Sequence, residues 1–159
     1  MVKFTWKDGC APTISTEHSA GADMVANEEV VIQPGEVRAV CTGVWIDSVD
    51  DDVLRNSYLA LFIRSSLAMK QSICLANGTG VVDMDYPDEI KVLLHNFGEN
   101  PVSINKGERI AQMILTPHLQ HFMNCKRIEE ERIGGFGSTG VGPEVGGLST
   151  ADTTEHDAD

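Results

Sequence analysis

The 159-residue sequence predicts an all-β protein, a jelly-roll-like β-sandwich, and two observations lead to that fold class. Apolar and β-branched residues gather in runs of strand length, at residues 30–32, 37–46, 58–63, 90–97 and 109–115. Turn-forming residues separate the runs, with a glycine in each of the segments 33–36, 98–101 and 105–108. Short apolar runs between tight reversals are typical of antiparallel strands, and sheets of such strands pack face to face around a core.

Two segments in the first half of the chain have the composition of binding sites. Asp23 stands among small residues, a pattern more typical of a turn than of a metal site. Arg64 opens the one helix that the sequence predicts, around residues 66–70, with Ser65 or Ser66 as its N-cap. The free N–H groups at a helix start favour an anion, so this is a candidate phosphate site. A capped surface helix with a solvated arginine explains the same residues.

Residues 77–86 are predicted to form a hairpin in which acidic residues follow an apolar strand. Side chains alternate along a strand, so Asp83 and Asp85 point to the side opposite their apolar neighbours. One of these carboxylates can then act as a general base, and the amide of Asn77 can pair with a nucleobase edge. Alternatively, the two acids are solvated charges on an edge strand and Asn77 holds the turn.

In residues 107–114, a turn leads into an apolar strand that carries one polar side chain, Gln112. A buried amide needs a partner, which either the backbone or a ligand can supply. The sequence leaves these two interpretations open.

The glycine-rich stretch at residues 134–140 combines Phe136 with the hydroxyls of Ser138 and Thr139. Glycines let successive N–H groups face an anion, and an aromatic ring offers an apolar face, so the stretch can close over a nucleotide as a flap. Its composition equally fits a flexible tail. We therefore divide the chain into a β domain (1–133), a flap (134–141) and an acidic tail (142–159) that is predicted to be disordered.

Charge and cysteine content exclude other classes of protein. A net charge of −12 argues against a nucleic-acid surface, which needs clustered Lys and Arg. A small phosphorylated ligand remains compatible with that charge if local cations or a metal offset it, and the candidate cations are Arg64, Arg109 and Arg132. No apolar run is long enough to span a bilayer, and the four scattered cysteines are typical of reduced thiols. We expect a cytoplasmic protein without a membrane partner.

In this order and at these spacings, the five segments resemble the signature motifs of the homotrimeric dUTPases, which hydrolyse dUTP to dUMP and pyrophosphate. The resemblance runs from about residue 20 to residue 140, and residues 80–86 and 134–140 are its strongest parts. It implies a jelly-roll subunit in a threefold homotrimer, with active sites that each take residues from all three chains. It also implies a cellular role, which is to keep uracil out of DNA and to supply dUMP for thymidylate synthesis.

The resemblance implies a chemical role for each segment. Asp83 would deprotonate a water aimed at the α-phosphorus. Mg²⁺ would bind the triphosphate, with Asp23 holding the hydrated ion through water. The implied phosphate ligands are Arg64, Ser65, Ser66, Gln112 and Arg132.

Base and sugar recognition are implied for the 77–86 segment and for the flap. Asn77 and the backbone of Gly80 and Val82 would pair with the uracil edge, and Tyr86 would pack beneath the deoxyribose. The implied flap contacts are Phe136 over the uracil ring and Gly137, Ser138 and Thr139 near the phosphates.

Two alternatives remain open on the sequence. A dCTP deaminase has this fold and a similar Ser-Ser-Leu-Ala segment, but it uses a glutamate where this chain has Leu93. A non-catalytic dUTP-binding regulator would use the same architecture, with the acidic stretch at residues 47–56 or the tail as a contact surface.

Overall fold

The computed structural model describes residues 1–126 and confirms the all-β fold class. Over this range, the strands form four antiparallel sheets. The largest has the order β2 (Ala22–Val25), β11 (Arg109–Pro117), β6 (Ser57–Ile63) and β8 (Gly80–Asp83). A three-stranded sheet has the order β4 (Val37–Cys41), β9 (Lys91–Asn96) and β7 (Ile73–Leu75). The remaining pairs are β1 (Val2–Trp6) with β5 (Val44–Val49), and β3 (Val30–Ile32) with β10 (Val102–Ile104).

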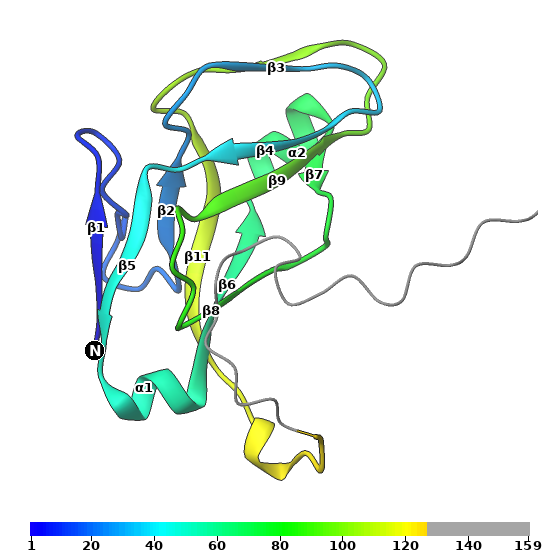
Figure 1. Ribbon diagram of the computed structural model, residues 1–159. Helices are drawn as coiled ribbons and strands as arrows, with labels where there is room; N and C mark the ends of the chain where they lie inside the picture. The colour runs from blue at the N-terminus through cyan, green and yellow to red at the C-terminus, as the bar shows by residue number, and fades with distance from the viewer. Residues whose placement is uncertain (127–159) are drawn as a thin grey trace, which may run out of the picture.

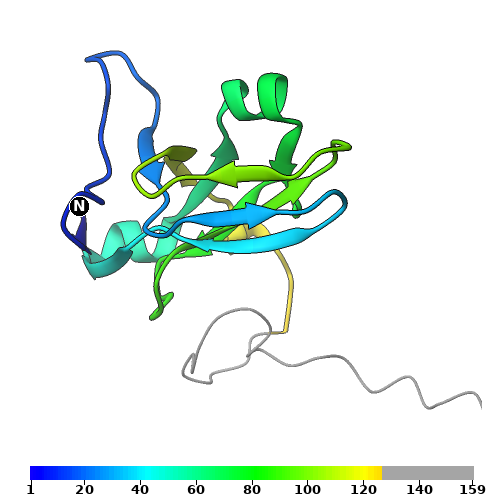
Figure 2. The same ribbon diagram turned by 90° about the horizontal axis from the view of Figure 1, so that it is seen from above.

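The two larger sheets share one apolar core. Figure 1 shows β4 and β9 crossing in front of β11 and β6, and Figure 2 shows the same layers from above. Buried side chains of both sheets meet in that space, among them Leu61 and Met113 from one sheet and Val40 and Leu94 from the other. Burying each such side chain contributes about 1.5–3 kcal/mol, so the core holds the two sheets in a fixed relation.

The three predicted reversals are present, but each carries the chain from one sheet to another. The reversal at residues 33–36 joins β3 to β4, the one at 98–101 joins β9 to β10, and the one at 105–108 joins β10 to β11. None of these pairs is hydrogen-bonded as a hairpin. Turn residues reverse the chain direction, but the core decides which sheet receives the next strand.

The same correction applies to residues 77–86, which do not form a hairpin. Gly78 makes the expected turn with a φ of 71°, but β7 before it pairs with β9, and β8 after it pairs with β6. The predicted run at residues 37–46 is also divided, because the chain leaves β4 and adopts a φ of 70° at Gly43 before β5 begins. Strands β1, β2, β7 and β10 were not among the predicted runs.

Helix α2 (Ser65–Gln71) lies where the sequence predicts a helix, with one correction at its start. Arg64 occupies the N-cap position in an extended conformation, without a side-chain capping bond, so neither Ser65 nor Ser66 is the cap. A second short helix, α1 (Asp51–Asn56), forms in the acidic stretch that joins β5 to β6. Asp51 and Asp52 lie in its first turn, where negative charge favours a helix. A single 3₁₀ turn, η1 (Gln120–Phe122), follows β11.

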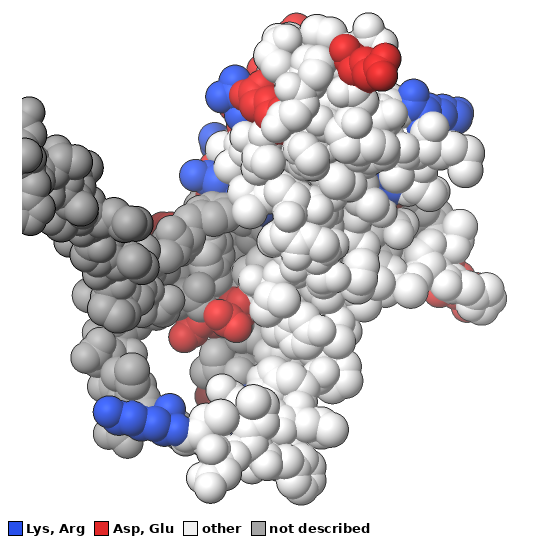
Figure 3. Space-filling view, turned by 90° about the vertical axis from the view of Figure 1, so that its right-hand side faces the viewer, with Lys and Arg blue, Asp and Glu red and all other residues white. Residues whose placement is uncertain are grey.

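The surface charges and the cysteines of residues 1–126 complete the description of the fold. Figure 3 shows a largely uncharged face with separate acidic and basic side chains. All four cysteines are free thiols, as predicted. Among residues 1–126, no helix has the length and apolar content needed to cross a bilayer.

Candidate active site

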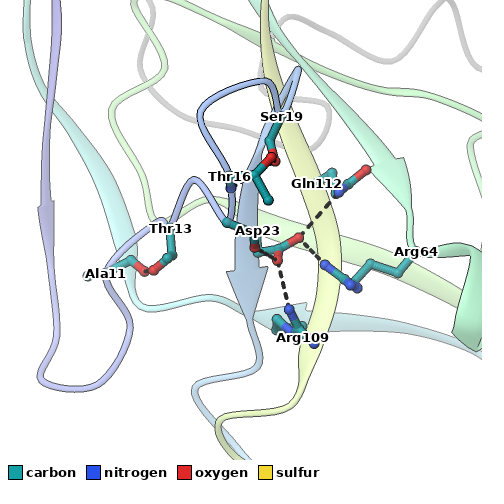
Figure 4. A network of polar contacts seen from close by, with 9 residues as sticks. Ala11, Thr13, Thr16, Ser19, Asp23, Arg64, Arg109 and Gln112 are labelled. Carbon is teal, nitrogen blue, oxygen red and sulfur yellow. Dashed lines mark hydrogen bonds and ion pairs between the residues drawn. The ribbon is translucent and has the colours of Figure 1, made fainter.

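Three strands of the largest sheet place two of the predicted phosphate ligands, Arg64 and Gln112, beside Asp23. Asp23 on β2 pairs in register with Gln112 on β11, and β11 pairs on its other side with β6, which ends one residue before Arg64. Figure 4 shows the side chains of Arg64 and Gln112 converging on the Asp23 carboxylate. Sheet register therefore assembles three residues that lie far apart in the sequence.

Four donors bind the Asp23 carboxylate, two on each oxygen. Oδ1 accepts hydrogen bonds from Nη1 of Arg64 and, at 3.4 Å, from Nε2 of Gln112. Oδ2 accepts from Oγ of Ser15 at 2.9 Å and from Nη1 of Arg109 at 3.1 Å. The Asp23 side chain is 4% exposed, so two guanidinium groups neutralise a carboxylate that is almost removed from water.

The partners of Asp23 set its pKa. Burial raises the pKa of this carboxyl, but the hydrogen bonds from Ser15, Arg64 and Gln112 and the positive charge of Arg64 lower it by more. The pKa therefore lies below the ordinary value of 3.8, and Asp23 is ionised at neutral pH.

Ser15 is the member of this cluster that the sequence analysis missed. It lies in the polar segment before β2, which an isolated bridge between Thr13 and Asp23 holds against the sheet. A serine in a polar loop carries no periodic signal, so nothing in the sequence marks it. Arg109 was noted only as a candidate cation, and the structure places it on Asp23.

The second part of the candidate site is β8 and the residues that follow it. Along β8, Gly80 and Val82 are buried while Asp83 is exposed, and the alternation continues with Asp85 exposed, as predicted. Close packing against β6 explains the glycine at position 80, because a Cβ there would lie 2.9 Å from the Cβ of Leu61.

The turn residues of this second part also have defined positions. Asn77 is exposed at the turn before β8. Tyr86 is buried, and its hydroxyl donates to the Glu89 carbonyl at 3.4 Å. Ser65 and Ser66 are exposed at the start of α2, beside Arg64.

Within one chain, Asp83 lies far from Arg64. Asp83 pairs with Tyr58 at the start of β6, whereas Arg64 follows the last residue of that strand, Ile63. At a rise of about 3.3 Å per residue, the chain from Tyr58 to Arg64 spans about 20 Å. Register nevertheless puts Asp83 on the same face of the sheet as Asp23 and Gln112. Directly paired residues share a face, and the partners of Gln112 and Asp83 on β6, Phe62 and Tyr58, are an even number of residues apart.

The remaining predicted site residues are in the C-terminal part of the chain. Arg132, Phe136, Gly137, Ser138 and Thr139 lie outside the described residues 1–126. In that described range, no group of three or more His, Cys, Asp or Glu side chains is placed to hold a metal ion.

Comparison with known proteins gives consistent results. The dUTPase family model matches residues 7–140. The deoxyuridine 5'-triphosphate nucleotidohydrolase of Rickettsia canadensis is 41% identical over 138 residues, covering 84% of this chain and 90% of the relative. The protein of the same name from Neisseria meningitidis serogroup C is 43% identical over 137 residues, covering 81% and 87%.

Solved structures show the same fold. A dUTPase from Streptococcus mutans superposes with a TM-score of 0.66 at 28% identity, covering 73% of this chain and 95% of that one. A dUTPase from phage phi11 of S. aureus gives 0.67 at 19% identity, covering 82% and 97%, a likeness that concerns the fold alone. A mutant of that phage enzyme coordinates a structural Mg(II) ion.

Proposed function

This chain belongs to the dUTPase family and is a dUTP diphosphatase, and from that premise we propose that Asp83 activates the water that attacks the α-phosphorus of dUTP. The placement of Asp83 carries this proposal. It is an exposed carboxylate at the end of an edge strand, on the same sheet face as the Arg64 and Gln112 side chains. A general base needs access to water and a fixed backbone, and this position supplies both.

The proposed reaction is an in-line displacement at the α-phosphorus. Asp83 takes a proton from water as the water oxygen bonds to phosphorus, the bond to the bridging oxygen breaks, and pyrophosphate leaves. The expected phosphate donors are Arg64, Ser65, Ser66 and Gln112, joined by Arg132 from the C-terminal part. These donors stabilise the charge that develops on the phosphate oxygens.

We further propose that the chain works as a homotrimer with shared active sites. Asp83 and Arg64 lie about 20 Å apart along one sheet, too far to act on one phosphate within a single chain. The side chains of Phe62 and Val81, between these two ends, are 39% and 62% exposed. An apolar strip between two halves of a site supports contact with another copy of the chain.

We propose that the 77–86 segment and the flap select the substrate. Asn77 and the backbone of Gly80 and Val82 would read the uracil edge, and the buried ring of Tyr86 would form the floor under the deoxyribose. Phe136, Gly137, Ser138 and Thr139 would cover the bound nucleotide. A site that pairs with uracil leaves polar groups unmatched by cytosine, which is costly when they are buried.

Mg²⁺ is proposed as the counter-ion of the triphosphate, which a chain with a net charge of −12 needs to bind a polyanion. The expected role of Asp23, to hold this ion through water, meets a difficulty. A carboxylate has about four lone-pair directions, and the donors Ser15, Arg64, Arg109 and Gln112 occupy them. In this arrangement Asp23 has no acceptor position left for a metal-bound water.

One assay tests the proposed reaction. Purified protein is incubated with Mg²⁺ and dUTP, dTTP, dCTP or UTP, while pyrophosphate and deamination products are followed. We expect rapid pyrophosphate release from dUTP alone. Comparable release from dTTP, or deamination of dCTP, would contradict the assignment. We also propose a cytoplasmic location, which fractionation of cells that produce the protein tests.

A matched pair of variants tests the role of Asp83. Asp83→Asn should lower turnover of dUTP by about 10²–10⁴-fold, because an amide cannot take the proton, while binding of the non-hydrolysable analogue dUpNHpp is retained. Asp88→Asn makes the same chemical change at an exposed position nearby and should keep most of the turnover. Normal turnover in Asp83→Asn would remove Asp83 from the mechanism.

A further inference from the structure

The two oxygens of Asp23 have partners of different kinds. Oδ1 accepts from Arg64 and Gln112, which are both expected phosphate ligands. Oδ2 accepts from Ser15 at 2.9 Å and Arg109 at 3.1 Å, and neither of these is among the phosphate ligands that the family resemblance implies. Oδ1 therefore binds donors that are also expected to bind the triphosphate, whereas the donors on Oδ2 can remain bound to Asp23 when substrate is present.

The carboxylate is held firmly, whereas Arg64 has room to move. The backbone of Asp23 exchanges two hydrogen bonds with Thr13, of 2.8 and 3.1 Å, in addition to its pairing with β11. Gly21, just before β2, lets the chain approach β11 closely, because a Cβ at this position would lie 2.8 Å from Cγ1 of Ile114. The side chains of Arg64 and Arg109, by contrast, are long, and they are 21% and 56% exposed, so a guanidinium group here can turn to another acceptor.

We propose that Asp23 Oδ1 occupies the place of a phosphate oxygen in the ligand-free chain, and that Arg64 and Gln112 transfer from it to the bound triphosphate while Ser15 and Arg109 hold Oδ2. This inference rests on the proposed function. Asp23 is then a positioning residue, which keeps two phosphate donors ordered before the substrate arrives.

Charge balance makes the exchange feasible. Arg64 gives up one charge-assisted hydrogen bond to an oxygen anion and gains another of the same kind, so the transfer costs little. A buried carboxylate that lost its only cation would be strongly destabilised. Arg109 prevents this, because it stays on Oδ2 when Arg64 leaves.

The exchange also resolves the difficulty with the metal. When Arg64 and Gln112 leave, Oδ1 becomes an open acceptor, which is what water-mediated contact with Mg²⁺ requires. The metal contact and the phosphate contacts would then form together, and the affinities of metal and nucleotide would be coupled.

Calorimetry with dUpNHpp, in excess EDTA and in saturating Mg²⁺, tests this coupling. In EDTA, Asp23→Asn should bind the analogue several-fold more tightly than the unaltered chain, because Arg64 no longer leaves an anion. Mg²⁺ should then strengthen binding to the unaltered chain but not to Asp23→Asn. Weaker binding in EDTA, or an unchanged response to Mg²⁺, would contradict the exchange. Asp47→Asn, the same change at an exposed position on β5, is the matched control.

A crystal structure of the unaltered chain with dUpNHpp and Mg²⁺ separates exchange from a simple loss of negative charge. We expect Arg64 and Gln112 on phosphate oxygens, with Ser15 and Arg109 still on Asp23. Arg64 remaining on Asp23 in that complex would refute the proposal, even if Asp23→Asn does not fold. Turnover of dUTP by the unaltered chain is measured in parallel, so that a failure of the proposed function is distinguished from a failure of the exchange.

Discussion

At the scale of single residues, the ionised Asp23 side chain links the polar cluster to stability. Its pKa is lower in the folded chain than its ordinary value of 3.8. Its ionised form therefore stabilises the fold fully above that value, and this contribution is lost as the pH falls through the lowered pKa. The donors lie in three separate parts of the chain, at Ser15, Arg64 and Gln112. The ionised carboxylate therefore links these parts to one another.

We predict that Asp23→Asn removes this acid-sensitive part of the stability. Near neutral pH, the substitution should lower the free energy of unfolding by about 1–3 kcal/mol, because two guanidinium groups lose their carboxylate partner. The difference between Asp23→Asn and the unaltered chain should shrink as the pH falls below 3.8. Urea denaturation at a series of pH values and a fixed protein concentration measures this. A difference that stays constant down to strongly acidic pH would contradict the prediction.

The residues of the cluster were only partly predictable from the sequence. Asp23, Arg64 and Gln112 could be selected because each lies in a motif that resembles a known family. Ser15 could not, because its role depends on a bridge that folds a polar segment back onto β2. The donor pairs on each oxygen depend on side-chain geometry, which residue spacing does not encode.

At the scale of elements, buried Asn96 at the end of β9 ties the three-stranded sheet to its surroundings. Its amide nitrogen donates to the carbonyls of Ile32 at 2.9 Å and Asn100 at 2.8 Å, and its oxygen accepts from the Gly98 amide at 2.9 Å. One side chain thus connects β9, β3 and the reversal that leads to β10. All of its hydrogen-bonding groups are satisfied without water.

We predict that Asn96→Ala destabilises the chain by about 2–4 kcal/mol, because it removes three hydrogen bonds and leaves buried backbone groups without a partner. The midpoint of urea denaturation measures the effect. Asn100→Ala is the matched control, since Asn100 contributes its backbone carbonyl, which the substitution keeps. Equal midpoints for the two variants would show that the Asn96 side chain adds little.

Elements were predictable where their apolar runs were long. Strands β6, β9 and β11 were expected almost at their observed bounds, because each has at least six residues and a run of apolar side chains, several of them buried. Strands β7 and β10 have three residues each, too few for a periodic signal. The reversals were found, but their partners were not, because strand pairing depends on how distant segments pack into the core.

At the scale of the whole molecule, the separation of Asp83 from Arg64 determines how the protein can work. Asp83 pairs with the start of β6 and Arg64 follows its last residue, so the length of one strand separates them and no side-chain rotation brings them together. This separation is the reason we propose that each site takes Asp83 and Arg64 from two different chains. The sequence alone suggested this only through its family resemblance, whereas the sheet register supplies a physical reason.

Complementation between two inactive variants tests the shared site. Arg64→Gln and Asp83→Asn should each be nearly inactive alone. In trimers co-expressed at equal amounts, a site is intact when Arg64 comes from an Asp83→Asn chain and Asp83 comes from a neighbouring Arg64→Gln chain. Each condition holds for half of the chains, so about one quarter of the sites should recover.

The recovery should appear as turnover of dUTP, because neither variant alters the residue that its partner chain supplies. Mixing the two purified variants without subunit exchange is the control, and it should give only the sum of their separate activities. Size-exclusion chromatography establishes that both samples contain the same assembly. If each chain built its own complete site, every site in the co-expressed trimers would carry one defect. Turnover would then stay at the level of the control, and the shared-site arrangement would be wrong.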